Sequence, residues 1–259
     1  MTARAIDLNC DLGESPDRVR NGTDAQLLDC VTSANIACGG HAGDEATMTE
    51  TVRAAIARGV AIGAHPGYPD REGFGRVELA MRAEEIRLSV ADQIRALDRV
   101  ARAMGAGLTH VKPHGALYHA AMTKPLIASA IADACRKVSP GIVLVGLAGA
   151  PALGWWRAAG FRVASEAFAD RRYEADGSLR SRAHADSLII DPALAAAQAV
   201  DLALGRGVVA VDGACVPIRA DTVCIHSDTP GAVSVARAVR AALASAGFAL
   251  ASLAAVRSI

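Results

Sequence analysis

The chain has 259 residues and carries 27 basic residues (Lys and Arg) against 27 acidic ones (Asp and Glu). This balance argues against a broad surface for nucleic acid or acidic membranes, so we expect neither as a partner. Hydrophobic residues make up 52% of the chain and aromatic residues only 3%. Such a composition predicts a core of small aliphatic side chains, as in buried parallel strands covered by helices.

The sequence carries no sign of export or membrane insertion. Residues 1–7 lack the apolar stretch of a signal peptide, and no run approaches the roughly 18 apolar residues of a membrane span. The six cysteines include no CxxC pair, which is typical of small core residues in a reducing compartment. We therefore expect a cytoplasmic protein.

A strand, a glycine-rich loop and a helix follow one another early in the chain. The apolar run 32–37 ends at Gly39 and Gly40, as expected at the end of a buried strand. Asp44 is suited to cap the helix that follows, and His41 lies between the two elements. Ligands and catalytic groups collect at this edge of α/β folds, because strand carboxyl ends and helix amino ends open onto one face.

Polar residues recur at four other predicted strand ends. Asp11 follows the strand 5–8, His65 follows 61–64, His114 follows 109–112, and His226 follows 223–225.

Further strands are predicted over 142–147, 162–164 and 208–211, and helices over 24–31, 82–104, 124–137, 152–159, 191–204 and 229–245. The long loop 65–78 is predicted to form an ordered wall or lid of the site, and 174–185 a surface hairpin beside it.

Alternating strands and helices predict an α/β fold with a mostly parallel sheet. Polar residues at nearly every strand end favour a closed or nearly closed β/α barrel, because an open sheet would concentrate them at one switch point. No linker-like segment or internal repeat divides the chain, so we expect a single domain over residues 1–259.

The strand-end imidazoles and carboxylate suit either a divalent metal, with Asp11, His41 and His65 as candidate ligands, or proton transfer near neutral pH. The sequence leaves both interpretations, a metal site and proton transfer, open. Lys112 and Arg76 are candidate ligands of a carboxylate or phosphate. His110 and His119 are expected to point away from the barrel mouth.

A charge cluster follows the predicted strand 162–164 and is interpreted as functional; it consists of Glu166, Asp170, Arg171 and Arg172. The sequence has no GxxxxGK[ST] loop, no GxGxxG after a strand and no GxSxG elbow. If the protein uses ATP, it binds it unconventionally or relies on a partner.

Several motifs resemble the LamB/YcsF family, whose members are the A subunits of 5-oxoprolinases. The matching runs are Asp7 to Glu14, Ser33 to Asp44, Gly63 to Asp70, Gly73 to Arg76, Val111 to Tyr118 and Glu166 to Tyr173. Three positions depart from the family pattern: Ser227 replaces a glycine, Val77 an arginine and His119 an asparagine. The resemblance implies a distorted seven-stranded β/α barrel like those of the glycoside hydrolase and polysaccharide deacetylase superfamily.

The resemblance also implies ATP-dependent opening of 5-oxo-L-proline to L-glutamate, in a complex with PxpB and PxpC subunits. On this hypothesis the catalytic residues are Asp11, His41, His65, Glu166 and Asp170, and the substrate-binding residues are Asn9, Asn35, Arg76, Lys112, His114, Arg172 and His226. Two alternatives stay open: a metal-dependent deacetylase or amidohydrolase that acts alone, and a non-catalytic binding subunit.

Overall fold

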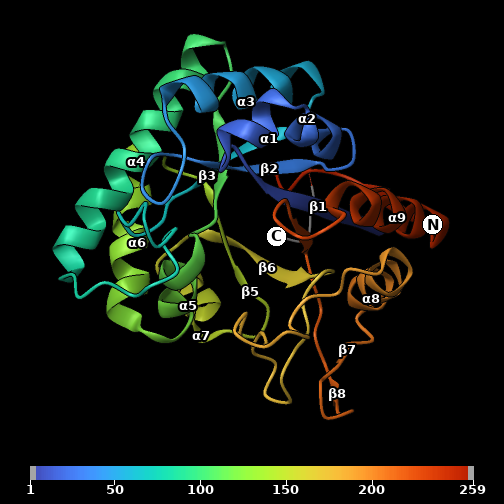
Figure 1. Cartoon of the computed structure of the whole chain (residues 1–259). Helices are drawn as coiled ribbons and strands as arrows, with labels where there is room; N and C mark the ends of the chain where they lie inside the picture. The colour runs from blue at the N-terminus through green and yellow to red at the C-terminus, as the bar shows by residue number, and fades with distance from the viewer. Residues whose placement is uncertain (1–3, 256–259) are drawn as a thin grey trace.

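The computed structural model describes residues 4–255, so the ends of the predicted 1–259 domain lie outside the described residues. Seven parallel strands close into a barrel (Figure 1). They are β1 (Arg4–Leu12), β2 (Ser33–Ala37), β3 (Ala61–His65), β4 (Leu108–Val111), β5 (Val143–Leu147), β6 (Arg162–Phe168) and β9 (Thr222–His226). The barrel closes because β9 pairs with both β6 and β1. The predicted β/α barrel is confirmed.

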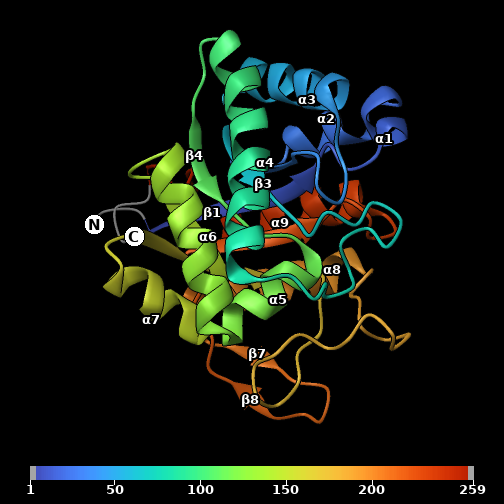
Figure 2. The same cartoon turned by 90° about the vertical axis from the view of Figure 1, so that its left-hand side faces the viewer.

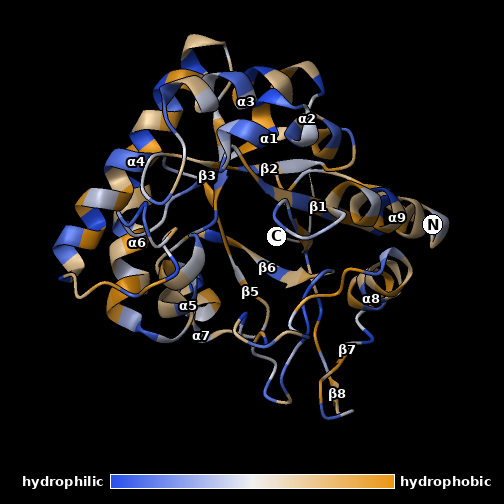
Figure 3. Ribbon diagram, in the orientation of Figure 1, coloured by the Kyte–Doolittle hydropathy of each residue, from blue (hydrophilic) through white to orange (hydrophobic). Residues whose placement is uncertain are grey.

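Helices surround the barrel (Figures 1 and 2). They are α1 (Pro16–Arg20), α2 (Thr23–Leu28), α3 (Glu45–Ala57), α4 (Ala83–Ala103), α5 (Gly115–Thr123), α6 (Pro125–Val138), α7 (Pro151–Ala158), α8 (Pro192–Leu204) and α9 (Ala232–Ser245). In α4, Val90, Ile94 and Leu97 are buried while Arg95 is exposed, so one face covers the barrel. Figure 3 shows the resulting mixture of apolar and polar segments along the helices. Within residues 4–255, no helix combines the length and apolarity needed to cross a membrane.

Some elements differ from the prediction. The predicted helix 24–31 is preceded by an unpredicted one, α1, and Gly22, with a φ of +81°, separates α1 from α2. α5 was not predicted as a separate helix, and β6 extends four residues beyond the predicted strand. The predicted strand 208–211 does not join the barrel: β7 (Val208–Val209) pairs antiparallel with β8 (Cys215–Val216) across a tight turn. The short β10 (Phe248–Leu250), also unpredicted, pairs with the first residues of β1.

The barrel interior contains a chain of hydrogen-bonded polar side chains. The Thr222 hydroxyl donates to Asp7 Oδ2 at 2.5 Å, and Asn9 Nδ2 donates to that hydroxyl at 2.6 Å. Asn35 Nδ2 donates to Asn9 Oδ1 at 2.7 Å and to Asp11 Oδ1 at 2.8 Å. Burial, only partly offset by the hydroxyls that donate to the carboxylate, raises the pKa of Asp7 to about 6. The network therefore connects the bottom of the barrel to Asp11 at its mouth.

His110 belongs to the same network and lies inside the barrel, as its place in a strand predicted. Its Nε2 is 2.8 Å from Asn35 Oδ1, and its Nδ1 is 2.8 Å from the Thr109 hydroxyl. A side chain at Gly63 would collide with this ring, because a Cβ there would lie 2.1 Å from His110 Nε2. The glycine in β3 thus makes room for an imidazole that fixes Asn35 from the side.

Candidate active site

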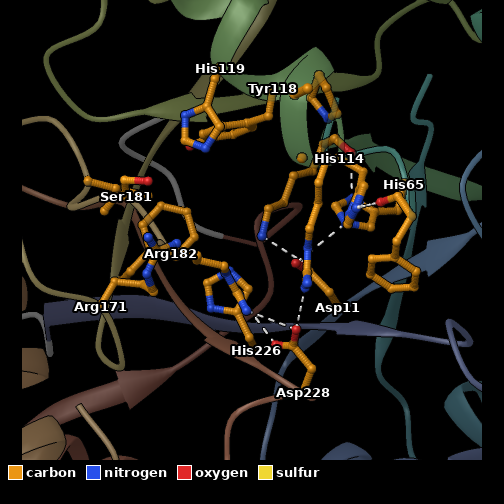
Figure 4. Close-up of a pocket in the computed structure, with 18 of the residues that line it drawn as sticks. Asp11, His65, His114, Tyr118, His119, Arg171, Ser181, Arg182, His226 and Asp228 are labelled. Carbon is orange, nitrogen blue, oxygen red and sulfur yellow. Dashed lines mark hydrogen bonds and ion pairs between the residues drawn. The ribbon is translucent and has the colours of Figure 1, made fainter. Parts of the chain in front are cut away.

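A cavity of about 390 Å³ opens at the carboxyl ends of the barrel strands. It brings together residues from strand ends and loops that are far apart in the sequence (Figure 4). Its lining includes Asp11, Glu14, His65, Phe74, Arg76, Lys112, His114, Tyr118, His119, Phe168, Arg171, Arg182, His226 and Asp228. The loop 65–78 contributes Phe74 and Arg76, and the segment 174–185 contributes Arg182, as predicted for parts that flank the site.

Lys112 is the central buried cation of this cavity. Its Nζ lies 2.8 Å from Asp11 Oδ1, 2.8 Å from Glu166 Oε1 and 3.1 Å from Cys224 Sγ. Burial opposes the charge of Lys112, but Asp11, Cys224 and Glu166 outweigh burial and raise its pKa well above the usual value. Lys112 therefore stays charged and ties β1, β4, β6 and β9 together.

Asp11 and His65 form an acid–base pair beside this lysine. His65 Nε2 is 3.4 Å from Asp11 Oδ2. Burial favours the neutral acid, yet His65 and Lys112 hold the pKa of Asp11 well below its ordinary value. Burial alone would lower the pKa of His65, but the Asp11 carboxylate outweighs it and raises that pKa. Asp11 is thus a carboxylate at neutral pH, next to an imidazole that can carry a proton.

The hydrogen bonds of two histidines fix where their lone pairs point. His65 Nδ1 lies 2.7 Å from the Lys112 carbonyl and His114 Nε2 lies 2.9 Å from the Phe74 carbonyl. A carbonyl only accepts, so both of these nitrogens carry a proton. The remaining nitrogens, His65 Nε2 and His114 Nδ1, are 3.1 Å apart, and each lies within 4 Å of Glu14 Oε1.

His41 completes this group from the other side. Its ring stacks on His114 with centroids 3.6 Å apart, and its Nε2 is 3.4 Å from Glu14 Oε1. His41 is 1% exposed, and neither ring nitrogen has a hydrogen-bond partner among residues 4–255. Burial, together with nearby His65, lowers the pKa of His41 to about 2. Gly67 and Gly75 leave the space for this ring, since a Cβ at either would lie 2.7 Å from a His41 atom.

Glu14, His41, His65 and His114 could together hold a divalent metal. Each offers one ligand atom, and these atoms all lie within 4.8 Å of one another. Neutral imidazoles with a carboxylate are the usual ligands of zinc, and backbone carbonyls that accept from the second ring nitrogen are the usual outer partners. The sequence-based set of Asp11, His41 and His65 contained neither Glu14 nor His114. Glu14 was missed because it lies two residues beyond the end of β1, although the matched motif includes it.

A second imidazole site faces the cavity from β9. His226 Nδ1 lies 3.0 Å from Asp170 Oδ1, while the Thr229 hydroxyl donates to Asp170 Oδ2 at 2.6 Å. The His226 ring also stacks on Phe168, with centroids 5.2 Å apart. Asp170 is fully buried and does not reach the cavity. It therefore orients the imidazole, much as the carboxylate of a catalytic triad does.

The structure separates the other predicted residues into two groups. Arg76, Lys112, His114 and His226 line the cavity together with Asp11 and His65, whereas Asn9, Asn35, Glu166, Asp170 and Arg172 do not. Asn9 and Asn35 lie inside the barrel, and Glu166 supports Lys112 from below. His41 borders a smaller neighbouring cavity, next to Glu14 and Phe74.

Two corrections concern side-chain direction. Arg171 lines the cavity and Arg172 does not, because neighbouring residues of an extended segment point to opposite sides. The prediction that His119 points away from the mouth is wrong: α5 begins at the barrel mouth and carries both Tyr118 and His119 into the cavity wall. Tyr118 is the last residue of the matched run that begins at Val111, and His119 follows it directly, at a position that departs from the family pattern.

The fold and site define a β/α-barrel protein equipped for acid–base or metal-assisted hydrolysis. Residues 6–258 match the family model described as the LamB/YcsF family, and the chain belongs to this family. The chain is 52% identical over 251 residues to the 5-oxoprolinase A subunit of Methylococcus capsulatus, covering 97% of this chain and 96% of the relative.

Solved structures agree with this assignment. A lactam utilization protein from Thermus thermophilus is 46% identical and superimposes with a TM-score of 0.89, covering 96% of this chain and all of that one. A family 4 carbohydrate esterase from Streptomyces lividans shares the fold, with a TM-score of 0.50 and 12% identity, covering 95% of this chain and 91% of that one. The barrel thus has the same fold as this carbohydrate esterase.

The ion triad around Lys112 predicts a large loss of stability when the lysine is removed. Lys112→Met leaves Asp11 and Glu166 buried without their cation, so we expect the free energy of unfolding to fall by about 3–5 kcal/mol in urea denaturation. Lys124→Met is the matched control, because Lys124 pairs with Glu78 at the surface and should contribute less than about 1 kcal/mol. Equal losses in the two variants would contradict a stabilising role for the triad.

Proposed function

We propose that this chain is the ring-opening component of an ATP-dependent 5-oxoprolinase, which converts 5-oxo-L-proline to L-glutamate together with PxpB and PxpC subunits. Close relatives over nearly the full length are the A subunits of 5-oxoprolinases, and this similarity carries the proposal. The cavity supports it, since it presents a carboxylate, oriented imidazoles and several cations to a small polar molecule.

The chemistry explains why a partner is needed. A five-membered lactam is a stable amide, so its oxygen is first phosphorylated by ATP, with ADP as the leaving product. The sequence has none of the usual nucleotide-binding loops. We assign the phosphorylation to the partner proteins and the hydrolysis of the activated lactam to this chain.

The residues of the cavity have defined roles in this hydrolysis. Asp11, beside which His65 lies, accepts a proton from water as the water oxygen adds to the ring carbonyl carbon. The ring C–N bond then breaks, and the nitrogen takes a proton from His226, which Asp170 holds in place. The product is the open-chain acyl phosphate, and a second water releases phosphate and leaves glutamate. Lys112 offsets negative charge that develops on the oxygen of the attacking water, because the former carbonyl oxygen carries the phosphoryl group.

We also propose that Glu14, His41, His65 and His114 bind a divalent metal ion such as zinc. Two observations support this assignment. The ring nitrogens of His41 have no hydrogen-bond partner among residues 4–255, and hydrogen bonds to backbone carbonyls orient the free nitrogens of His65 and His114 toward Glu14. When bound, the ion would supply Lewis-acid polarisation of a carbonyl oxygen or activation of water. The same ligand set favours the alternative of a metal-dependent deacetylase that acts without partners.

Asp11→Asn tests the role assigned to the cavity. We expect glutamate release from 5-oxoproline and ATP to fall at least about 100-fold in the complex, because the variant keeps the shape of the carboxylate but loses its charge. Assembly with the partners, measured by size-exclusion chromatography, should be unchanged. Asp92→Asn, at an exposed position on α4, is the control and should retain full activity. Full activity of Asp11→Asn would favour a non-catalytic binding role.

Metal content tests the proposed ion site. Elemental analysis of the purified chain after zinc loading should give about one zinc ion per chain. We expect His41→Ala to lower this zinc content at least about tenfold. A rise in melting temperature on zinc addition should disappear in the same variant. His184→Ala, which removes an exposed histidine, is the control. Zinc binding that is equal in His41→Ala and the original chain, or absent from both, would exclude this site.

A further inference from the structure

The side chains that line the cavity divide it into two parts of opposite charge. The floor contains the carboxylates of Asp11 and Glu14, whereas the opposite wall carries Arg171 and Arg182. Figure 4 shows these two arginines across the cavity from His65 and His114. An anionic group of a ligand is repelled by the floor and attracted by the arginine wall.

Arg171 is a buried cation without a carboxylate partner. It is 4% exposed and forms no ion pair within residues 4–255. Its guanidinium donates to the backbone carbonyls of Arg180 at 2.5 Å and Ser187 at 3.4 Å, which hold it in place but do not neutralise it. Burial, together with the neighbouring Arg182, lowers the pKa of Arg171 to about 10. A buried charge of this kind is costly unless a ligand supplies the counter-charge.

Arg182 and Arg76 add further positive charge to this wall of the cavity. Arg182 Nη1 and Arg76 Nη2 both bind Asp228 Oδ2, at 2.9 Å and 2.5 Å. One carboxylate therefore serves two guanidinium groups. The buried Asp170 carboxylate also attracts Arg171, but its hydrogen bonds go to His226 and Thr229, so three positive charges face two negative ones. The wall therefore keeps a surplus of positive charge that an anionic ligand can neutralise. Guanidinium groups also offer pairs of donors in the geometry that phosphate oxygens accept.

We propose that Arg171 and Arg182 form an anion subsite that holds the dianionic phosphoryl group of the activated lactam. This assignment rests on the proposed function, which supplies a substrate that carries phosphate. It places the phosphoryl group on the arginine wall and leaves the ring carbonyl carbon toward Asp11 and His65. The carboxylate that the lactam also carries is the competing source of negative charge, and the experiment separates the two.

Binding of inorganic phosphate to the isolated full chain tests the subsite. Calorimetric titration at pH 8, with EDTA present so that phosphate cannot bind through a metal, should show saturable binding. We expect Arg171→Met and Arg182→Met each to weaken phosphate binding at least about tenfold, the loss typical of a charge-assisted contact. Binding of 5-oxo-L-proline, a monoanion, should change less than about twofold.

Arg180→Met is the matched control on the same wall. Its guanidinium already pairs with Glu174 and Asp186, and its backbone carbonyl, which Arg171 uses, survives the substitution. Its phosphate binding should stay within about twofold of the original chain. Arg182→Met keeps both backbone hydrogen bonds of Arg171, so it tests the subsite even if Arg171→Met fails to fold, which circular dichroism would show.

Three results would overturn the subsite: no phosphate binding by the original chain, equal losses in Arg180→Met and the two test variants, or a larger loss for 5-oxoproline than for phosphate. The last result would assign the arginines to the carboxylate. The titration needs neither ATP nor partners, so it is independent of glutamate release. Arginine-dependent phosphate binding in a chain whose complex releases no glutamate would reject the proposed function and retain the phosphate site.

Discussion

The buried ammonium group of Lys112 is the interaction on which the site depends. It lies between Asp11 on β1 and Glu166 on β6, at 2.8 Å from each carboxylate. Burial favours the neutral form of Asp11, and Lys112 is one of the two cationic neighbours that oppose this effect. His65 and Lys112 together hold the pKa of Asp11 low, and the Asp11 carboxylate in turn raises the pKa of His65.

The same constraint shapes the rest of the cavity. Carboxylates gather at the floor around Lys112, the neutral rings of His41 and His114 lie beside Glu14, and the arginines occupy the far wall. Such an arrangement orients a molecule that is anionic at one end and electrophilic at its carbonyl carbon. The polar network below, through Asn35 and Asp11, limits the movement of the floor.

Much of this could be predicted from the sequence, and the failures have physical causes. Strand-end polar residues predicted the barrel and brought Asp11, His65 and His114 to one mouth, because strand periodicity and crossover topology are local and regular. The prediction failed where a single residue step decides direction, as with Arg171 against Arg172. It also missed β10, and it could not tell that Asn35 points into the barrel interior, because contacts between distant strands decide these points.

The coupling between ATP use and ring opening tests the central claim most directly. The partner proteins without this chain, given 5-oxoproline and ATP, should release ADP with little glutamate, and addition of this chain should bring the ratio of glutamate to ADP close to one. Glutamate formed by this chain alone without ATP would contradict the account. Glutamate formed by the partners alone would contradict it as well, because ring opening would then lie outside this cavity.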